Sequence, residues 1–425
     1  MGIFKEYDIR GVYPEEIDEA KAYELGKAIG SYFPEESIFL GYDNRKGSVA
    51  IKDYVAKGLA EAGKEVVDIG MVPVTVLAFA TLKEHNPGVC ITASHNPAKY
   101  TGLLLYKDGV TIMPKDVEQA YLGSKTNGLG SRGEIKKKDY TASYIAFITK
   151  TLAPMKLSIG VDTMGGATHA FAKQVFEHVG ISAVMLRKQP DANFYNKAPE
   201  PSKANAAELA ELVKSQGLDF GVQFDGDGDR VAFVDDQGNF VDAMGMAMLY
   251  IKHLGFRNVV ATVACSRKLE TFAKVVYTKV GRPHIEQLMS TGKFDLGIET
   301  SMHVYFGRYF PFSDGLLGAL LMAKALQNAG KSMSKLVKEL PKTYFGEFSI
   351  PFDSEELRNR KLEEIEKAAS AYGTLDFTDG VKIMTGSGFV LVRKSNTEPL
   401  LRVYYEGEDE AELRQLEGLA RKLTS

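Results

Sequence analysis

The alternation of strand-like and helical segments is the feature that most limits what this chain can fold into. Residues 37–41, 66–70 and 89–92 are short apolar runs of strand length, and helical spacing of apolar residues lies between them over 49–59 and 74–84. Strands that alternate with helices predict a mostly parallel sheet with helices on its faces. The first part of the chain is therefore expected to be an α/β domain.

The same order of segments returns twice. Residues 157–162 form an apolar run that leads through a Gly-Gly turn into a helix expected to end near Val179. Residues 259–263 lead through the polar residues 265–268 into a second expected helix. The interval is about 100 to 120 residues, which is an ordinary domain size. The pattern predicts three related α/β domains.

The last eighty or so residues differ from this pattern. Strand-like runs at 347–352, 381–384, 388–393 and 400–405 surround one charged helix over 355–372. Strands grouped in this way indicate a small α+β domain with an antiparallel sheet. The expected domains are 1–139, 140–240, 241–343 and 344–425.

Composition and charge exclude several classes of protein. The 425 residues are 44% hydrophobic and 25% charged, and the formal net charge of -3 argues against the basic surface of a nucleic-acid-binding protein. No apolar run reaches the roughly 18 residues of a membrane span, and residues 1–8 lack a signal-peptide core. Cys90 and Cys265 lie in apolar runs, which favours buried thiols over a disulfide. We expect a cytoplasmic protein without nucleic-acid or membrane partners.

Residues 225–230 read Asp-Gly-Asp-Gly-Asp-Arg and follow the apolar run 219–224. Close carboxylates repel each other by about 1 kcal/mol or more per pair, so a cation is expected among Asp225, Asp227 and Asp229. Hard divalent cations such as Mg²⁺ and Ca²⁺ prefer oxygen ligands, and the two glycines allow a tight loop. A solvated acidic turn is the alternative, because Asp-Gly pairs are common in turns.

An EF-hand is excluded for this loop. If the loop began at Asp225, its sixth and twelfth positions would be Arg230 and Asp236, where an EF-hand needs Gly and Glu. The following residues 231–234 are strand-like, whereas an EF-hand continues into a helix.

Residues 92–97 read Thr-Ala-Ser-His-Asn-Pro and come directly after an expected strand. Ligands of parallel α/β sheets collect outside the carboxyl ends of the strands, which makes Ser94 a candidate nucleophile. Ser94 lacks the flanking glycines of a hydrolase elbow, so a serine-hydrolase site is disfavoured. A simple Ser-Asn-Pro turn is the alternative.

Two further polar segments end strand-like runs. Residues 393–399 place a guanidinium, an ammonium, two hydroxyls and an amide close together, which suits a phosphate group as well as it suits a polar hairpin turn. Residues 299–303 bring together Glu299, Ser301 and His303, which could bind sugar hydroxyls or could simply end a strand with a hydrogen-bonded histidine.

Taken together, these motifs resemble the α-D-phosphohexomutases, the phosphomannomutase/phosphoglucomutase superfamily. The resemblance rests on residues 7–11 (Tyr-Asp-Ile-Arg-Gly), 92–97, 225–230, 299–303 and 393–397, which occur in the order of that family. It spans the chain from residue 4 to about residue 405. It implies four domains, three α/β with mixed sheets and one α+β, around a central cleft.

The resemblance also implies roles for individual residues. Ser94 is expected to be the phosphoserine, and Asp225, Asp227 and Asp229 to bind Mg²⁺ together with a phosphoserine oxygen. A sugar phosphate would pass through a hexose 1,6-bisphosphate, which is also the activator. The residues expected to line the reacting centre are Arg10, Arg230 and His95, the last as a candidate acid or base. Those expected to bind the substrate are Tyr7, Glu299, Ser301, His303, Arg393, Ser395, Asn396 and Thr397.

The chain also departs from the family pattern. Leu104 stands where the family has a lysine that acts as general acid or base, and leucine cannot transfer a proton. Ala264 replaces a substrate-binding lysine of some relatives, Met302 replaces a glycine, and the segment between residues 281 and 297 is short. Two functions follow as alternatives: a divergent phosphohexomutase in which His95, Lys99 or Lys107 moves the proton, or a catalytically impaired sugar-phosphate-binding or regulatory protein.

Overall fold

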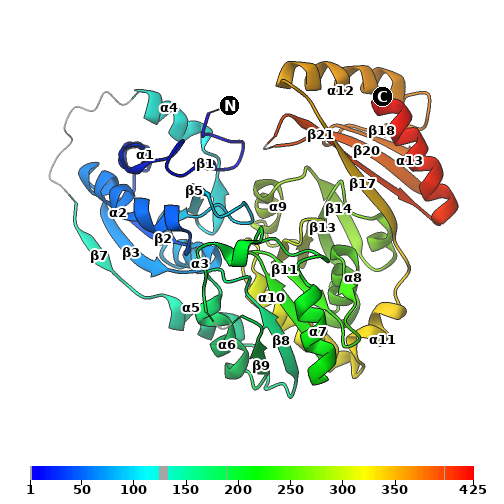
Figure 1. Cartoon of the computed structure of the whole chain (residues 1–425), viewed down its shortest axis with the longest axis horizontal. Helices are drawn as coiled ribbons and strands as arrows, with labels where there is room; N and C mark the ends of the chain where they lie inside the picture. The colour runs from blue at the N-terminus through cyan, green and yellow to red at the C-terminus, as the bar shows by residue number, and fades with distance from the viewer. Residues whose placement is uncertain (1, 124–132, 188, 397) are drawn as a thin grey trace.

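The computed structural model describes residues 2–123, 133–187, 189–396 and 398–425, and four sheets organise them (Figure 1). We number the domains by these sheets. The first sheet has the order β1-β5-β4-β2-β3-β7, with β6 paired to β5. Its strands are β1 (Ile9–Val12), β2 (Ser37–Tyr42), β3 (Glu65–Met71), β4 (Gly88–Ile91), β5 (Tyr100–Lys107), β6 (Val110–Ile112) and β7 (Ile135–Lys137). Its helices are α1 (Glu19–Tyr32), α2 (Lys46–Glu61), α3 (Val74–Glu84) and α4 (Lys115–Gly123).

The second and third sheets repeat this architecture with fewer strands. The second has the order β12-β11-β10-β8-β9 and the third β14-β13-β15-β16. The second domain contains α5 (Thr141–Thr149), β8 (Ser158–Asp162), α6 (His169–His178), β9 (Ser182–Met185), η1 (Phe194–Asn196), α7 (Ala207–Gln216), β10 (Phe220–Phe224), β11 (Val231–Val234) and β12 (Phe240–Val241). The third contains α8 (Ala243–Leu254), β13 (Asn258–Thr262), η2 (Arg267–Thr271), β14 (Lys274–Thr278), α9 (Arg282–Met289), β15 (Leu296–Ile298), β16 (Val304–Phe306), α10 (Gly315–Ala329) and α11 (Met333–Lys338).

The fourth sheet is antiparallel throughout, as the sequence predicts, in the order β17-β21-β20-β19-β18. It consists of β17 (Tyr344–Pro351), β18 (Thr374–Asp376), β19 (Val381–Thr385), β20 (Gly388–Lys394) and β21 (Leu400–Gly407), with α12 (Glu355–Ala369) and α13 (Glu410–Thr424) beside it. Asp409 caps the start of α13, since its carboxylate accepts hydrogen bonds from the backbone N–H groups of Ala411 and Glu412.

Each candidate loop joins two antiparallel neighbours in a sheet. The loops at 92–99, 225–230 and 299–303 connect β4 to β5, β10 to β11 and β15 to β16, and all three pairs are antiparallel. The loop at 395–399 connects β20 to β21 in the same way. β4, β10 and β15 also pair in parallel with a second neighbour, so the three α/β sheets are mixed. Their loops therefore leave the carboxyl edges of parallel strands, where ligands bind in α/β proteins.

The prediction of a helix after residue 268 is wrong. The structure has only the short 3₁₀ helix η2 there, followed directly by β14, which pairs in parallel with β13. Residues 275–278 (Val-Val-Tyr-Thr) are of types that favour strands. The segment between β13 and β14 is too short to form a stable α-helix.

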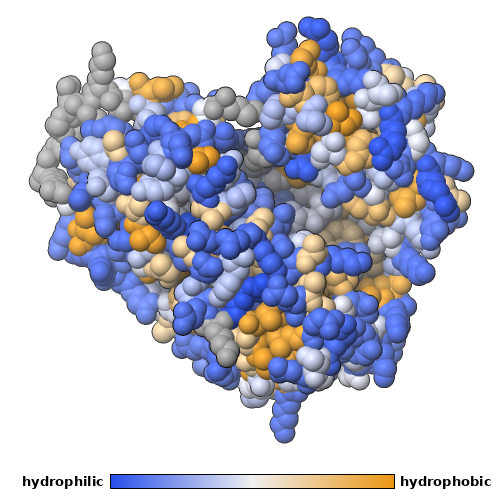
Figure 2. All heavy atoms as spheres, viewed as in Figure 1, coloured by the Kyte–Doolittle hydropathy of each residue, from blue (hydrophilic) through white to orange (hydrophobic). Residues whose placement is uncertain are grey.

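The largest apolar clusters follow the domains, and a smaller cluster around Val263 and Phe389 packs the third domain against the fourth. One buried apolar cluster runs without interruption from the first domain through the second to the third, whereas the fourth domain has a cluster of its own around Val390 and Val403. Figure 2 shows a heart-shaped outline with a hollow between the first and fourth domains. Cys90 and Cys265 are buried free thiols, as predicted. None of the helices in the described part of the chain combines the length and apolar character that a bilayer span requires.

Candidate active site

The loop that carries Ser94 has a fixed and unusual backbone shape. Ser94 has φ 47°, in the left-handed region that a non-glycine residue rarely adopts, and its N–H donates to Thr92 Oγ1 over 2.9 Å. The Ser94 side chain is buried, with 1% of the residue exposed. Strain of this kind gathers at functional sites when the surroundings hold it in place.

Arg45 holds the shape of this loop. Its guanidinium donates to the carbonyl oxygens of Ser94, Asn96 and Pro97 over 2.5, 2.7 and 2.8 Å, and its Nε pairs with Asp43 over 3.0 Å. The side chain is completely buried. Arg45 was not predicted from the sequence to be a site residue. The available indication was its place in a polar loop directly after the strand at 37–41.

The three aspartates of the Asp-Gly-Asp-Gly-Asp loop form a buried cluster beside Ser94. One carboxylate oxygen from each lies within 4.8 Å of the others, and all three residues are at most 2% exposed. Ser94 Oγ donates to Asp225 Oδ2 over 2.9 Å, and Thr92 Oγ1 donates to Asp227 Oδ2 over 3.0 Å. The two loops that the sequence singled out independently are therefore in direct contact.

Gly226 allows this contact. A Cβ at position 226 would lie only 2.6 Å from the carbonyl oxygen of Ser94, closer than real Cβ contacts come. The glycines of the loop therefore also permit the Ser94 loop to approach the aspartates, in addition to permitting a tight turn.

The aspartates differ in electrostatic environment. Burial raises the pKa of Asp225 well above its ordinary value, and the charges of Asp227 and Asp229 raise it further; burial and Asp229 also raise the pKa of Asp227. Burial alone would raise the pKa of Asp229 too, but His303 and Arg282 hold it below its ordinary value. The first two carboxylates are therefore short of positive charge.

This deficit fits a bound cation. Asp227 Oδ1 is buried and has no hydrogen-bond partner among the described residues. The donors are carboxylate oxygens with a serine hydroxyl beside them, which is the ligand type that a hard divalent cation prefers. The geometry is compatible with magnesium.

Positive groups surround Ser94 on its open side. Arg230 donates to His95 Nδ1 over 2.8 Å, and Arg10 donates to the Asn96 side chain over 2.8 Å. His95 Nδ1 also lies 3.5 Å from Ser94 Oγ. Burial, and then the charges of Arg230 and Arg10, lower the pKa of His95 well below its ordinary value. The imidazole of His95 is therefore neutral near pH 7.

The third-domain loop reaches the aspartate cluster through His303. His303 Nδ1 lies 2.8 Å from Glu299 Oε2, and His303 Nε2 lies 3.3 Å from Asp229 Oδ1. Ser301 Oγ donates to Glu299 Oε2 over 3.2 Å. Met302 has φ 70°, so the loop contains a left-handed residue that is not glycine.

The fourth-domain loop contacts the first and third domains. Arg393 pairs with Asp379 over 2.7 Å and donates to Asn396 Oδ1 over 2.7 Å. Asn396 Nδ2 donates to the hydroxyl of Tyr7 over 2.8 Å, and this hydroxyl donates to the carbonyl of Val280 over 3.1 Å. Ser395 lies in the same loop and is buried. Thr397, also expected to bind the substrate, lies outside the described residues.

A cavity of about 530 Å³ opens beside these groups. Its lining includes Arg10, His95, Glu200 and Glu398, so the first, second and fourth domains all contribute to it. This volume accommodates a small polar molecule. The Ser94 loop reaches it through His95, Asn96 and Pro97, and the fourth-domain loop reaches it through Glu398.

Models of known protein families match all four domains. Residues 1–128, 138–238 and 242–344 match the α/β/α domains I, II and III of phosphoglucomutase/phosphomannomutase, and residues 354–422 match its C-terminal domain. A phosphomannomutase/phosphoglucomutase of Pseudomonas syringae is 32% identical over 98% of this chain and 94% of its own length.

The chain belongs to the phosphoglucomutase/phosphomannomutase family.

Solved structures agree with this assignment. The crystal structure of a phosphoglucomutase/phosphomannomutase family protein from Burkholderia thailandensis superimposes with a TM-score of 0.90, at 25% identity, over 99% of this chain and 96% of that one. The fold is shared more distantly by the N-acetylphosphoglucosamine mutase of Aspergillus fumigatus, solved with GlcNAc-6P and magnesium, with a TM-score of 0.57 at 15% identity over 83% of this chain and 91% of that one.

Two of the three proposed proton carriers, Lys107 and Lys99, make no contact with Ser94 among the described residues. Lys107 is paired with Glu35 at the far end of β5 and does not contact the Ser94 loop. Lys99 is exposed, with its ammonium 5.7 Å from the ring centre of Tyr100. Of the three candidates, only His95 lies within 3.5 Å of Ser94 Oγ.

Arg282, the first residue of α9, was not identified from the sequence. Its guanidinium donates to Asp229 Oδ2 and to the hydroxyl of Tyr106, both over 2.9 Å. A lone Arg-Pro pair in a short segment gives no indication of a partner 53 residues away, so only the fold reveals this contact.

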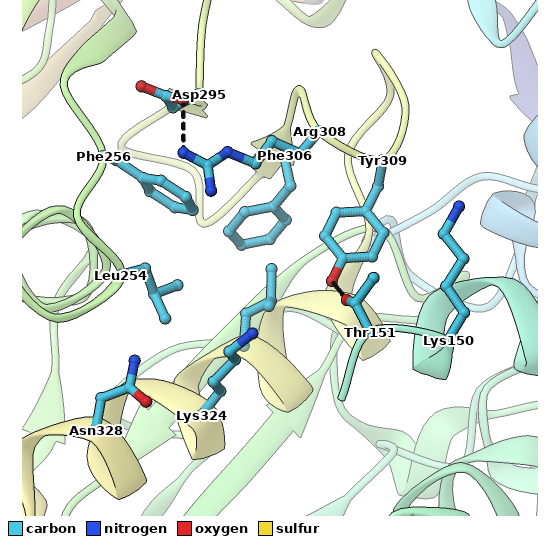
Figure 3. A pocket seen from close by; sticks show the side chains of 11 residues that line it. Lys150, Thr151, Leu254, Phe256, Asp295, Phe306, Arg308, Tyr309, Lys324 and Asn328 are labelled. Atoms are coloured by element: carbon cyan, nitrogen blue, oxygen red, sulfur yellow. Dashed lines mark hydrogen bonds and ion pairs between the residues drawn. The ribbon is translucent and has the colours of Figure 1, made fainter. Parts of the chain in front are cut away.

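A second cavity lies elsewhere in the family fold (Figure 3). It has a volume of about 240 Å³ and an apolar floor that includes Phe256 and Phe306. Asp295, at its edge, precedes the first residue of β15, whereas Glu299 follows the last, so this cavity and the aspartate cluster lie at opposite ends of the strand. The candidate site residues are absent from its lining.

Proposed function

We propose that this chain is a phosphohexomutase that moves a phosphoryl group between the 1- and 6-positions of a hexose phosphate. The observation that carries the proposal is the 2.9 Å contact between Ser94 Oγ and Asp225 within a buried cluster of three aspartates. Family membership supports a phosphohexomutase activity. The phosphoserine, the hexose 1,6-bisphosphate intermediate and the dependence on Mg²⁺ are parts of the proposal.

In the proposed cycle Ser94 begins phosphorylated. The Oγ–P bond breaks while a hydroxyl oxygen of the sugar phosphate bonds to phosphorus, and the hydroxyl proton ends on Ser94 Oγ. The resulting bisphosphate turns in the cleft and returns its other phosphoryl group to Ser94 by the reverse of these steps. The atoms balance without any other reactant, apart from the bisphosphate that primes Ser94.

Asp225, Asp227 and Asp229 would hold Mg²⁺ together with a phosphoserine oxygen. When bound, the ion would neutralise charge that builds up on the transferring phosphoryl group. The unpaired oxygen of Asp227 and the raised pKa values of Asp225 and Asp227 support this assignment.

The residues around Ser94 are proposed to stabilise the phosphoryl group and to transfer the proton. Arg10 and Arg230 carry positive charge beside the loop and would attract the phosphoryl oxygens. His95 is the proposed proton carrier, because it is neutral near pH 7 and lies 3.5 Å from Ser94 Oγ.

The third and fourth domains would bind the rest of the substrate. Glu299, Ser301 and His303 are proposed to contact sugar hydroxyls. Arg393, Ser395, Asn396 and Thr397 are proposed to hold the phosphate that does not react, with Tyr7 beside them. The contact between Asn396 and Tyr7 supports this proposal, since it brings the fourth-domain loop to the first domain.

The domain boundaries 1–139, 140–240, 241–343 and 344–425 are also proposed. Each range contains one sheet and one candidate loop, except that Val241, the last residue of β12, falls across the second boundary. A cytoplasmic location is proposed from the same sequence features as before.

The test combines mass and turnover. Intact mass spectrometry of the purified protein should show one added phosphate located at Ser94, and Ser94→Ala should lack it. In a coupled assay with glucose 1-phosphate or mannose 1-phosphate and a catalytic amount of the 1,6-bisphosphate, Ser94→Ala should lose roughly a thousandfold or more of the activity. Ser215→Ala, an exposed serine of the second domain, serves as the matched control.

One observation favours a second function. Leu104 is 1% exposed and part of the apolar core, so it offers no proton at the place where the family has a lysine. A protein that is fully phosphorylated on Ser94, binds sugar phosphate and does not turn over would be a sugar-phosphate-binding or regulatory protein. That result would refute the mutase proposal.

A further inference from the structure

Arg282 connects three domains at the edge of the aspartate cluster. It lies on α9 of the third domain, and its NH1 donates both to Asp229 in the second domain and to Tyr106 on β5 of the first, each over 2.9 Å. Its side chain is 11% exposed. A buried charge of this kind must be paired, and both partners come from other domains.

The position of Tyr106 places this contact beside Leu104. Side chains alternate along a strand, so Leu104 and Tyr106 lie on the same face of β5, one strand repeat of roughly 7 Å apart. Leu104 brings no charge to this face. Tyr106 instead holds a guanidinium that arrives from α9.

The chemistry of arginine limits what this group can do. A guanidinium keeps its charge at any physiological pH, so Arg282 cannot donate or accept a proton in the reaction. It can neutralise negative charge, and its Nε and NH2 make no hydrogen bond within the described part of the chain. A fork with free donors suits phosphate oxygens.

We propose that Arg282 supplies fixed positive charge to the metal and phosphoryl site. This inference rests on the proposed function. In this arrangement the charge comes from Arg282 on α9, and the proton is carried by another group. Because Arg282 donates to Asp229, a proposed metal ligand, it would also weaken the binding of the metal.

The inference predicts opposite effects on metal binding and on transfer. Arg282→Met should lower kcat at least tenfold with little change in KM, since the lost charge acts on the transferring phosphoryl group. The same variant should bind Mg²⁺ roughly tenfold more tightly in titration calorimetry of unphosphorylated protein, because a positive charge beside Asp229 is gone. A role limited to holding the domains together would weaken both metal binding and transfer.

Matched variants make the test specific. Arg282→Lys keeps the charge and should retain most of kcat. Leu104→Lys combined with Arg282→Met should recover part of the lost kcat, because the charge returns from β5. Tyr106→Phe removes only the hydroxyl that holds Arg282 and should lower kcat by less than Arg282→Met does. Arg308→Met removes an arginine of the same domain that lies in the cavity of Figure 3 and should change neither quantity.

Failure of this inference can be told apart from failure of the proposed function. An active wild-type enzyme whose kcat is unchanged in Arg282→Met would refute only the role of Arg282. A wild-type protein without turnover would refute the mutase proposal, and the metal titration would then decide on Arg282. Unchanged or weaker Mg²⁺ binding by Arg282→Met would overturn the inference. Thermal unfolding checks that this variant is folded. If it is not folded, Tyr106→Phe is the second variant for the same measurements.

Discussion

Glu286 is a buried carboxyl group whose ionisation should make the free energy of unfolding depend on pH. It lies on α9 and is completely buried, and its Oε2 accepts a hydrogen bond from the N–H of Thr111 on β6 over 2.7 Å. Its Oε1 has no partner in the part of the chain that the structure describes. Burial raises the pKa of Glu286 from 4.5 to about 7, although Arg282 and the N–H of Thr111 oppose the shift.

The size and sign of the effect follow from this shift. Each unit of difference between the folded and unfolded pKa corresponds to about 1.4 kcal/mol, so the whole difference corresponds to about 3 kcal/mol. The folded state holds this proton more tightly than the unfolded state. The contribution to stability is therefore complete below pH 4.5 and is lost as the pH rises to about 7.

Replacing Glu286 with glutamine removes the charge and keeps an oxygen that can accept the hydrogen bond from Thr111. Glu286→Gln should be more stable than the wild type at pH 8, by up to about 3 kcal/mol, and nearly equal to it at pH 4.5. Thermal unfolding of both proteins between pH 4.5 and pH 8 measures the difference. Hydrogen exchange at the Thr111 amide reports the same change locally.

The control is Glu356→Gln on α12, where the wild-type side chain is 85% exposed, and its stability should follow the wild type at every pH. Parallel pH profiles for Glu286→Gln and the wild type would show that Glu286 is ionised in the folded protein at no cost. The argument from burial would then be wrong.

Two further predictions concern the contact between the Ser94 and aspartate loops. Gly226→Ala should destabilise the protein by about 1 to 3 kcal/mol and strongly reduce turnover, because its Cβ would meet the Ser94 carbonyl oxygen at 2.6 Å. Unfolding measures the stability and the coupled assay measures the turnover. Unchanged stability and turnover would contradict the close packing. Asp227→Asn should weaken Mg²⁺ binding at least tenfold in calorimetry. It should also stabilise the metal-free protein by about 1 kcal/mol, because it relieves repulsion among buried carboxylates. A destabilised metal-free protein would contradict this electrostatic account.

The sequence anticipated much of the site because its motifs are local. Residues 92–97 and 225–230 each follow an apolar strand. The rule that ligands bind at carboxyl ends of parallel strands indicated a site at 92–97, and repulsion among close carboxylates indicated a cation at 225–230. Their direct contact, through Ser94 and Asp225, is a fact of the fold. The antiparallel sheet of the last domain was also predicted correctly.

The residues that were missed act over long separations. Arg45 holds carbonyl groups that lie about fifty residues further along the chain, and Arg282 pairs with Asp229 across a domain boundary. Neither residue sits in a motif that local spacing can identify. The helix wrongly expected after residue 268 has a related cause, since pairing of β14 with β13 determined that segment more strongly than the repeat pattern did.

The sequence by itself determined most of the segments that become strands and helices, and which polar residues follow the strands, because side-chain periodicity and turn chemistry act between near neighbours. Only the tertiary structure decided how the charges of the site are balanced. That balance depends on groups from the first and third domains, among them Tyr106, Arg282 and His303, meeting one aspartate loop of the second. Burial makes each such charge costly unless a partner is brought to it, and the fold alone determines which partner that is.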